Sequence, residues 1–366
     1  MRSSYMEVDL DSFNFNISQI KKYIGDNVDI MPVVKANCYG THINYRMDIL
    51  NNFNIVAVAI SEEAEQLRNL GYRNEIFCLN QPNITDIEKI VENNITIGLS
   101  STEFLKEIAN RKESITVHLE IETGMGRTGI KVENLEDFIN EINKLNNVKV
   151  EGIYTHFSVA DTDREYTETQ IDKFNTALEI VEKKIGKLKY IHTAASNGIL
   201  NFKDSYFNLV RPGLIMYGYE SFKGVIDKIE LKPVAKLVST INFIKNVKKG
   251  ESISYGRKFI ANKEMNVATV PIGYADGIRR EYFQKGYVVI NNKKAKIIGA
   301  ICMDSFMVDI TDISNVHVGN KVYIWDNQII TLDEISKALN TINYEILSTI
   351  SDRVPRKFIK KGELYV

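Results

Sequence analysis

Short runs of apolar, largely β-branched residues recur between residues 30 and 217, and stretches with helical spacing separate them. The eight runs occupy residues 30–34, 55–60, 76–79, 95–99, 115–121, 150–154, 190–193 and 209–217. Continuous apolar runs are typical of parallel strands that are buried on both faces. Strands that alternate with helices indicate β-α-β units, so the pattern predicts eight such units.

Two of the intervening stretches, 61–70 and 135–145, carry apolar residues at helical spacing. The first begins at Ser61 and has acidic residues in its opening turn, as helix starts commonly do. Eight β-α units in about 200 residues are the minimum for a (β/α)8 barrel. An open doubly wound sheet is the rival, but no GxGxxG motif follows the first run. We therefore expect an α/β fold built on a TIM-type barrel.

After about residue 225 the helical stretches nearly vanish and short strand-like runs follow one another closely. These runs occupy residues 235–244, 267–272, 287–290, 295–301, 306–310 and 322–325, and the segments KKGE, NNKK and VGN between them are turn-like. One helix is expected at 331–339, with Thr331 as its N-cap. The sequence thus predicts a barrel over residues 1–229 and a smaller all-β domain over residues 230–366.

Composition and charge narrow the function classes. The 366 residues are 44% hydrophobic and 25% charged, which is an ordinary globular balance. Lys plus Arg is 46 and Asp plus Glu is 47, so the net charge of −1 provides no global attraction for nucleic acid. No run approaches the ~20 apolar residues of a membrane helix, and the N-terminus has no apolar signal core. We expect a cytoplasmic protein, or the cytoplasmic part of a longer membrane protein.

The cysteine and histidine patterns exclude two further classes. The three cysteines, Cys38, Cys78 and Cys302, are odd in number and far apart, which favours a reducing compartment over a disulfide framework. The five histidines show no metal-ligand spacing, and we expect no metal site.

Candidate chemistry follows the strands, because barrel enzymes carry their sites at the C-terminal ends of the strands. Lys35 follows the first run, where burial would lower its pKa and free the amine for Schiff-base chemistry. Arg127 follows the fifth run in a glycine-rich loop, His156 follows the sixth, and Arg211 lies inside the eighth. Residues 192–198 are small and polar, which suits backbone donors for an anion.

Each of these residues also has an ordinary structural explanation, such as a lysine that reaches solvent or a satisfied core histidine. Taken together, they place an amine and an anion cradle on one face of the barrel. That combination points to pyridoxal phosphate (PLP) as the cofactor.

Seven segments in one order carry a stronger signal. They are VVKANCYG, ETGMGRTGI, THFSVAD, RPGLIMYG, SYGRKF, PIGYADG and GAICMDSFMVDIT. The chain resembles the alanine racemase family from about residue 6 to residue 358. The resemblance implies a fold-type III PLP enzyme that acts on a small amino acid and forms a head-to-tail homodimer with shared active sites.

The resemblance also implies roles for the central residues. Lys35 would hold PLP covalently and act as the base for the D enantiomer, and Tyr255 of the other subunit would be the base for the L enantiomer. Racemisation removes a proton from one face of Cα and returns it on the other, so two bases must flank one plane. Arg211 would face the pyridine nitrogen as a permanent cation. His156 would link Tyr255 to Arg211 and help to lower the pKa of the tyrosine.

Further positions are carried over in the same way. Arg127 would support the ring hydroxyl of PLP and the substrate carboxylate. Met303, also from the partner subunit, would contact that carboxylate through its backbone N–H, and Tyr274 would line the mouth of the site. The residues implied to hold the phosphate are Tyr39, Ser196, Gly213 and Leu214.

Three positions depart from the family pattern. Asp352 stands before RVPR, where members commonly carry a tyrosine that contacts the cofactor phosphate. The shorter side chain would open space beside the substrate, and we expect it to pair with Arg353 or a water. The hypothesis is that this space admits serine beside or ahead of alanine, because serine racemases found with glycopeptide resistance also depart from tyrosine here.

The other two departures lie near the cofactor. Glu120 stands where many members carry a carbamylated lysine, and we expect its carboxylate to orient Arg127 directly. The loop that usually reads KANAYGHG is KANCYGTH here, and we expect Cys38 to be a small buried residue.

Two other functions share parts of this pattern. A non-catalytic PLP-binding protein would have a similar barrel but would lack a domain like residues 230–366. A fold-type III decarboxylase would share the two-domain plan, but it would match SYGRKF and GAICMDSF poorly.

Overall fold

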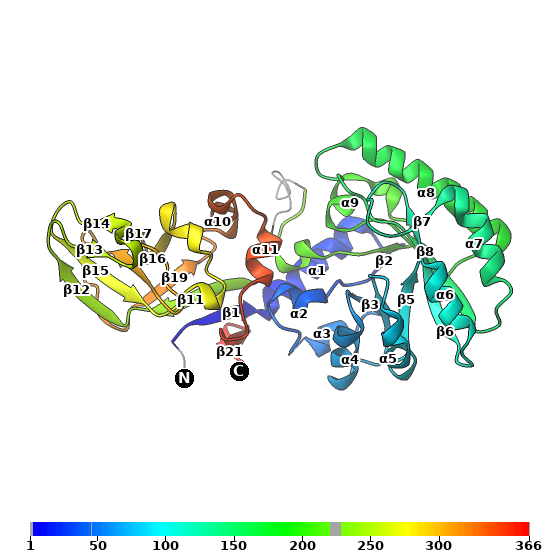
Figure 1. Cartoon of the computed structure of the whole chain (residues 1–366), viewed down its shortest axis with the longest axis horizontal. Coiled ribbons are helices and arrows are strands. Elements are labelled where there is room, and N and C mark those ends of the chain that lie inside the picture. The colour runs from blue at the N-terminus through cyan, green and yellow to red at the C-terminus, as the bar shows by residue number, and fades with distance from the viewer. Residues whose placement is uncertain (1–2, 45, 220–227, 366) are drawn as a thin grey trace.

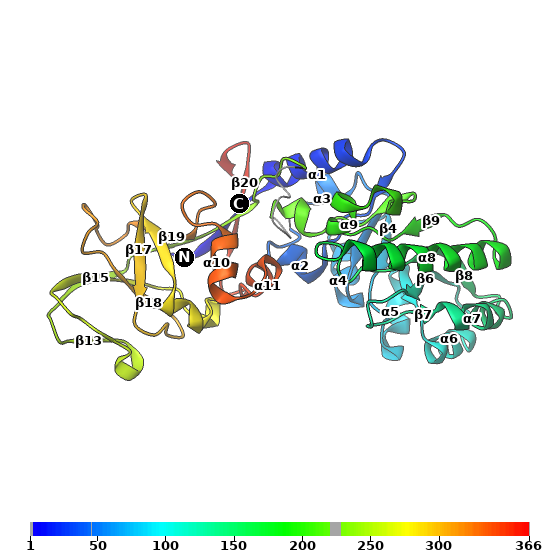
Figure 2. The ribbon, with the colours of Figure 1, turned by 90° about the horizontal axis from the view of Figure 1, so that it is seen from above.

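The computed structural model describes residues 3–44, 46–219 and 228–365. A barrel of strands and helices forms one end of the molecule, and a β-rich part forms the other (Figure 1). The 90° turned view separates the same two parts (Figure 2). In the described residues, no helix is both long enough and apolar enough to span a membrane. The boundary between residues 229 and 230 stays a prediction.

The barrel confirms the predicted eight-strand pattern. Its strands are β2 (Asp29–Ile30), β3 (Ile55–Val58), β4 (Glu75–Cys78), β5 (Ile95–Leu99), β6 (Ile115–Glu122), β8 (Val148–Tyr154), β9 (Tyr190–His192) and β10 (Leu209–Val210). Strands β3 to β9 pair in parallel in chain order, and the short β7 (Ile130–Lys131) adds to β6. A bridge from Val33 to Ala57, a bridge from Ala195 to Arg211 and the pairing of β10 with β2 close the ring.

Helices cover the outside of the barrel (Figure 1). They are α1 (Leu10–Ile24), α3 (Met47–Leu50), α4 (Ser61–Asn69), α5 (Ile87–Glu92), α6 (Thr102–Ala109), α7 (Leu135–Ile142), α8 (Arg164–Lys184) and α9 (Ser196–Asn201). The short element α2 (Lys35–Tyr39) follows the first barrel strand and contains left-handed residues. In α7, Leu135, Phe138, Ile139 and Ile142 are buried, which is the spacing of a single apolar helix face. Strands β3 and β5 are buried along their whole length, as their continuous apolar runs predict.

The C-terminal part is built on a ten-stranded sheet in the order β12-β15-β18-β17-β16-β19-β11-β1-β20-β21. The strands are β1 (Tyr5–Asp9), β11 (Ala235–Thr240), β12 (Phe243–Val247), β15 (Met265–Val270), β16 (Tyr287–Ile290), β17 (Lys293–Ile298), β18 (Phe306–Asp309), β19 (Lys321–Trp325), β20 (Arg356–Lys360) and β21 (Glu363–Leu364). A separate hairpin joins β13 (Ser252–Ile253) and β14 (Phe259–Ile260).

Two helices pack near this sheet. The predicted one is α10 (Leu332–Leu339), and the Thr331 side chain caps it by accepting a hydrogen bond from the N–H of Glu334 at 3.2 Å. The second, α11 (Asn343–Ser348), was not predicted from the sequence and lies beside the barrel (Figure 1).

Two expected strands differ from the structure, and a third strand was not predicted. The run 209–217 forms β10 only as far as Val210 and then the 3-10 helix η4 (Leu214–Tyr217), because Pro212 has no N–H for the sheet. The run 235–244 is two strands, β11 and β12. The first strand of the chain, β1, pairs with β11 and β20, so it lies in the C-terminal sheet.

Candidate active site

A cavity opens at the C-terminal ends of the barrel strands. It brings together seven of the predicted site residues, namely Lys35, Tyr39, Arg127, His156, Ser196, Arg211 and Gly213. They come from distant parts of the sequence and meet because the parallel strands present their C-terminal ends to the same side.

Lys35 opens an unusual turn. The four residues after it, Ala36 to Tyr39, have φ values of 50–56°, in the left-handed region that non-glycine residues rarely adopt. A carboxylate oxygen of Glu63 accepts the hydrogen bond of the Ala36 N–H at 2.6 Å and helps to hold this turn. Burial lowers the pKa of Lys35, and the cations of Arg127 and Arg211 lower it further while Glu63 opposes them. The amine therefore loses its proton more readily than a surface lysine does.

Arg211 is buried, and its two terminal nitrogens, Nη1 and Nη2, are held by the protein. It donates to the carbonyls of His192 and Thr155, both at 2.7 Å, and to His192 Nδ1 at 2.9 Å. Its Nη2 lies 3.4 Å from His156 Nδ1. Burial lowers the pKa of Arg211 to about 10, so the guanidinium remains charged at neutral pH. These contacts fix a permanent cation at the wall of the cavity.

The segments next to Arg211 offer small donors. The Ser196 hydroxyl, at the start of α9, accepts the N–H of Gly213 at 3.1 Å. A side chain at position 213 would place its Cβ 2.3 Å from the Tyr39 hydroxyl, so only glycine fits between these groups. Leu214 opens the 3-10 helix η4, and its backbone N–H has no partner inside that helix. The set is a cradle of hydroxyls and backbone donors for an anion.

Arg127 adds a second cation to the cavity, beside Arg211. Its side chain is exposed and lines the cavity, and within the part of the chain that the structure describes it forms no ion pair. PLP presents an aldehyde, a phosphate, a ring oxygen and a pyridine nitrogen. An activated amine, an anion cradle and two cations around one cavity fit those groups, and the residues present are therefore suited to this cofactor.

Three predicted site residues lie elsewhere. Tyr255, Tyr274 and Met303 are 71%, 41% and 51% exposed and do not line the cavity. They gather around Cys302, because the Tyr274 N–H donates to the Cys302 carbonyl at 3.0 Å and Ser254 Oγ lies 3.5 Å from Cys302 Sγ. Strands β13 and β14, which flank Tyr255, are at the end of the molecule away from the barrel (Figure 1).

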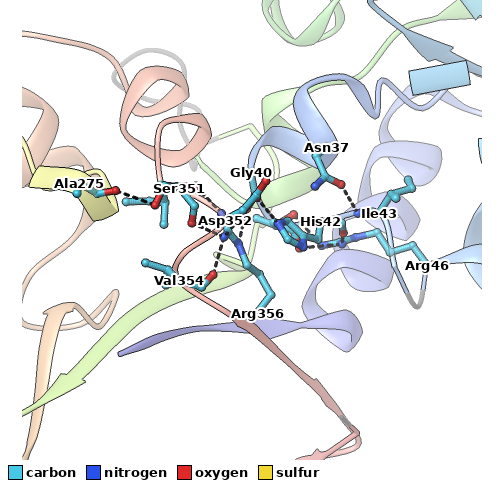
Figure 3. A network of polar contacts seen from close by, with 12 residues as sticks. Asn37, Gly40, His42, Ile43, Arg46, Ala275, Ser351, Asp352, Val354 and Arg356 are labelled. Carbon is cyan, nitrogen blue, oxygen red and sulfur yellow. Dashed lines mark hydrogen bonds and ion pairs between the residues drawn. The ribbon is translucent and has the colours of Figure 1, made fainter. Parts of the chain in front are cut away.

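Asp352 does not line the cavity, and it does not pair with Arg353 as expected. Its Oδ1 lies 3.0 Å from Nε2 of His42 and 3.9 Å from Nη1 of Arg356, as Figure 3 shows. Arg353 pairs instead with Asp304 at 2.6 Å and Asp276 at 3.5 Å, both in the C-terminal part.

Glu120 is buried, and burial raises its pKa. Its Oε1 accepts a hydrogen bond from the Thr128 hydroxyl at 2.9 Å. No ion pair joins it to Arg127 among the residues that the structure describes. The carboxylate therefore acts on the glycine-rich loop through Thr128, the neighbour of Arg127. Cys38 is buried as expected, and burial raises the pKa of its thiol to about 11.

Two residues of the site were missed by the sequence analysis. Glu63 could have been found, since it is the third residue of a predicted helix, where an acid reaches back to free backbone N–H groups. Tyr344 gave no signal. It belongs to α11, lines the cavity and packs its ring 5.8 Å from the ring of Tyr39.

The histidine pair behind Arg211 predicts a marked sensitivity to acid. Nδ1 of His118 lies 2.8 Å from Nε2 of His192, and burial lowers the pKa of His118 to about 3 and that of His192 well below its usual value. The unfolded chain takes up protons at these positions below pH ~6.5, whereas the folded chain does not. The free energy of unfolding is therefore highest above pH ~6.5 and decreases as the pH falls below it. Near pH 5, the two histidines together lower it by about 3 kcal/mol per pH unit.

Denaturant unfolding of the wild type and of His118→Asn between pH 7.5 and 5 measures this effect. The slope of the unfolding free energy against pH should be smaller in the variant than in the wild type, by about 1.4 kcal/mol per pH unit. Equal slopes for the two proteins would contradict the assignment.

Comparisons with known proteins agree with this geometry. The family model for the alanine racemase N-terminal domain matches residues 8–221, and that for the C-terminal domain matches residues 234–358. The chain is 37% identical over 377 residues to alanine racemase 2 of Caldanaerobacter subterraneus subsp. tengcongensis, covering 100% of this chain and 97% of the relative. It is 38% identical over 380 residues to the alanine racemase of Clostridium tetani, covering 100% and 97%.

Solved structures match along the same length. The alanine racemase of Clostridium difficile 630 superposes with a TM-score of 0.94 at 33% identity, covering 100% of this chain and 98% of that one. The Bacillus anthracis alanine racemase with bound L-Ala-P gives a TM-score of 0.94 at 33% identity, covering 100% and 97%. With both domain models and full-length relatives matched, the chain belongs to the alanine racemase family, whose cofactor is PLP.

Proposed function

We propose that this chain interconverts L- and D-alanine with Lys35 as one base and Tyr255 of a second copy as the other. The observation that carries the proposal is the partly buried Lys35 amine, which lines the same cavity as the anion cradle and whose pKa is lowered by burial and by the cations of Arg127 and Arg211. PLP, when bound, supplies an electron sink for the carbanion that proton removal creates.

Other residues at the cavity would bind the cofactor and orient the substrate. Ser196, Gly213 and Tyr39 would bind the phosphate, and Arg211 would face the pyridine nitrogen without giving it a proton, since its guanidinium stays charged. Arg127 would bind the substrate carboxylate in a two-pronged contact, which orients Cα toward the Lys35 amine. The lowered pKa of Lys35 increases the fraction of neutral amine, which is the form that accepts a proton.

The second base requires a second copy of the chain. Tyr255, Tyr274 and Met303 are exposed together on the C-terminal part and lie outside the cavity. An exposed tyrosine and an exposed methionine at one place suit a subunit interface. A two-fold dimer would bring this surface of each copy to the cavity of the other and complete both sites.

The second part of the proposal is that the enzyme also accepts serine as a substrate. Asp352 carries no ring, and its side chain turns to His42 rather than into the cavity. We therefore expect room for a hydroxymethyl group and a kcat/KM for L-serine similar to or above that for L-alanine.

Paired kinetics with L-serine and L-alanine test the substrate preference. A serine to alanine ratio of kcat/KM below about one in a hundred, or ~2.7 kcal/mol, would reject it. As the matched variant, Asp352→Tyr restores the ring and should lower the ratio, measured for both substrates at saturating PLP.

One experiment separates the racemase from its alternatives. Loss of optical rotation from pure L-alanine without release of CO2 supports racemisation. Release of CO2 would indicate a decarboxylase. If neither change occurred, a PLP-binding protein without catalytic activity would be indicated.

The described cysteines are free thiols, which is consistent with the cytoplasmic location that we propose.

A further inference from the structure

The turn that carries Lys35 is strained, and the strain continues beyond it. After the left-handed residues 36–39, His42 has a φ of 63° as well. Left-handed conformations of non-glycine residues persist only where the surrounding structure holds them. The position of the Lys35 amine thus depends on what holds residues 36–42.

A buried arginine from the C-terminal part contacts this turn. Arg356, at the start of β20, donates its Nε–H to the Gly40 carbonyl at 2.9 Å. Its other N–H groups donate to the carbonyls of Ile350, Ser351 and Val354 at 2.6–2.8 Å (Figure 3). One side chain therefore ties the segment 350–354 to the turn. The fit is close, because a Cβ at Gly40 would lie 2.3 Å from the Leu347 carbonyl oxygen.

His42 and Asp352 form a second tie between the same two segments. The His42 ring donates from Nε2 to Oδ1 of Asp352 at 3.0 Å, across 310 residues of sequence. The same carboxylate lies 3.9 Å from Nη1 of Arg356, whose side chain is buried. On the barrel side, the His42 carbonyl accepts from the buried Arg46. Arg356, Asp352 and His42 thus form one connected set of contacts, which we call the clasp.

The clasp joins two positions where this sequence departs from the racemase motifs. His42 stands in KANCYGTH and Asp352 before RVPR, and each departure taken alone has a cost. A non-glycine residue at position 42 pays for its positive φ, and a lone exposed carboxylate contributes little. In the structure the two side chains meet, so the residues are suited to each other.

We propose that His42 and Asp352 are positioning residues, which hold the turn 36–42 against the C-terminal segment and thereby place Lys35 and Tyr39 for the cofactor. The proposal goes beyond racemisation, because its readouts need no substrate and would stand even if the reaction were another. A merely structural pair would change global stability without a local effect on the turn.

A double-mutant cycle with His42→Asn and Asp352→Asn tests the clasp in the full-length chain. Asparagine tolerates a positive φ, so the first variant removes the ring contact without new backbone strain. The readouts are amide hydrogen exchange of residues 36–43 in the cofactor-free protein and the equilibrium dissociation constant for PLP. We expect each single variant to speed exchange in this segment about tenfold and to weaken PLP binding severalfold. The double variant should go no further than the stronger single variant.

The control removes another tie between the same two parts. Asp48 of α3 lies 3.5 Å from Lys360 of β20 but does not contact the turn. Asp48→Asn should leave exchange of residues 36–43 and PLP affinity unchanged. Additive effects of the two clasp variants, unchanged local exchange, or an equal effect of Asp48→Asn would each overturn the proposal.

Discussion

Lys35→Ala is expected to lower the rate of alanine racemisation by at least about 10³-fold, since it removes both the cofactor attachment and one base. Among the residues that the structure describes, no other lysine lines the cavity, so no second primary amine is placed to bind the cofactor. Purified variant and wild type would be compared by the change in optical rotation and by the visible absorbance of lysine-bound PLP.

Lys89→Ala is the matched control for this change. Lys89 lies on α5 at the outside of the barrel, where it pairs with Glu62 at 2.8 Å and Glu65 at 3.5 Å. Its loss should leave both activity and absorbance unchanged. A Lys35→Ala protein with the wild-type visible spectrum would show that another residue binds the cofactor.

Tyr255→Phe is expected to lower racemisation by about 10²–10⁴-fold, the usual contribution of a positioned acid or base. L- and D-alanine have equal free energies, so kcat/KM must fall equally in both directions. Exchange of the α-proton in D2O distinguishes the two faces. D-alanine should still exchange its proton through Lys35, whereas exchange from L-alanine should be lost. Equal exchange from both enantiomers would remove Tyr255 as a base.

Mixed dimers test whether the two bases come from different subunits. Lys35→Ala and Tyr255→Phe protomers are each inactive alone, but a dimer of one with the other contains one site with both bases. Random reassociation should therefore restore about a quarter of the wild-type activity. Failure to restore activity, with mixed dimers demonstrated, would contradict shared sites.

The barrel could be predicted from the sequence to a large extent, because buried parallel strands require continuous apolar runs. All eight runs contain barrel strands or their bridges, and run 95–99 coincides with β5. The eighth run was predicted too long, since its apolar residues after Pro212 are buried in a 3-10 turn rather than in a strand. Burial alone does not distinguish the two conformations.

The candidate site was predictable where position along the chain implies position in space. Lys35 and His156 follow apolar runs and Arg211 lies within one, and a barrel brings such positions to one face. Tyr255 and Met303 were recognised only from the resemblance of their motifs, because no periodicity relates their loops to the barrel. Tyr344 and the pairing of His42 with Asp352 were not recognised at all.

By itself, the sequence determined the local elements and the chemistry available at each strand end, since hydrophobic spacing and residue type act over a few neighbours. Only the tertiary structure decided which of those groups meet. It placed β1 in the far sheet, turned Asp352 to His42 instead of Arg353, and left Tyr255 exposed away from the cavity. These outcomes depend on contacts across hundreds of residues, whose energies are set by shape and charge in three dimensions and leave no local pattern.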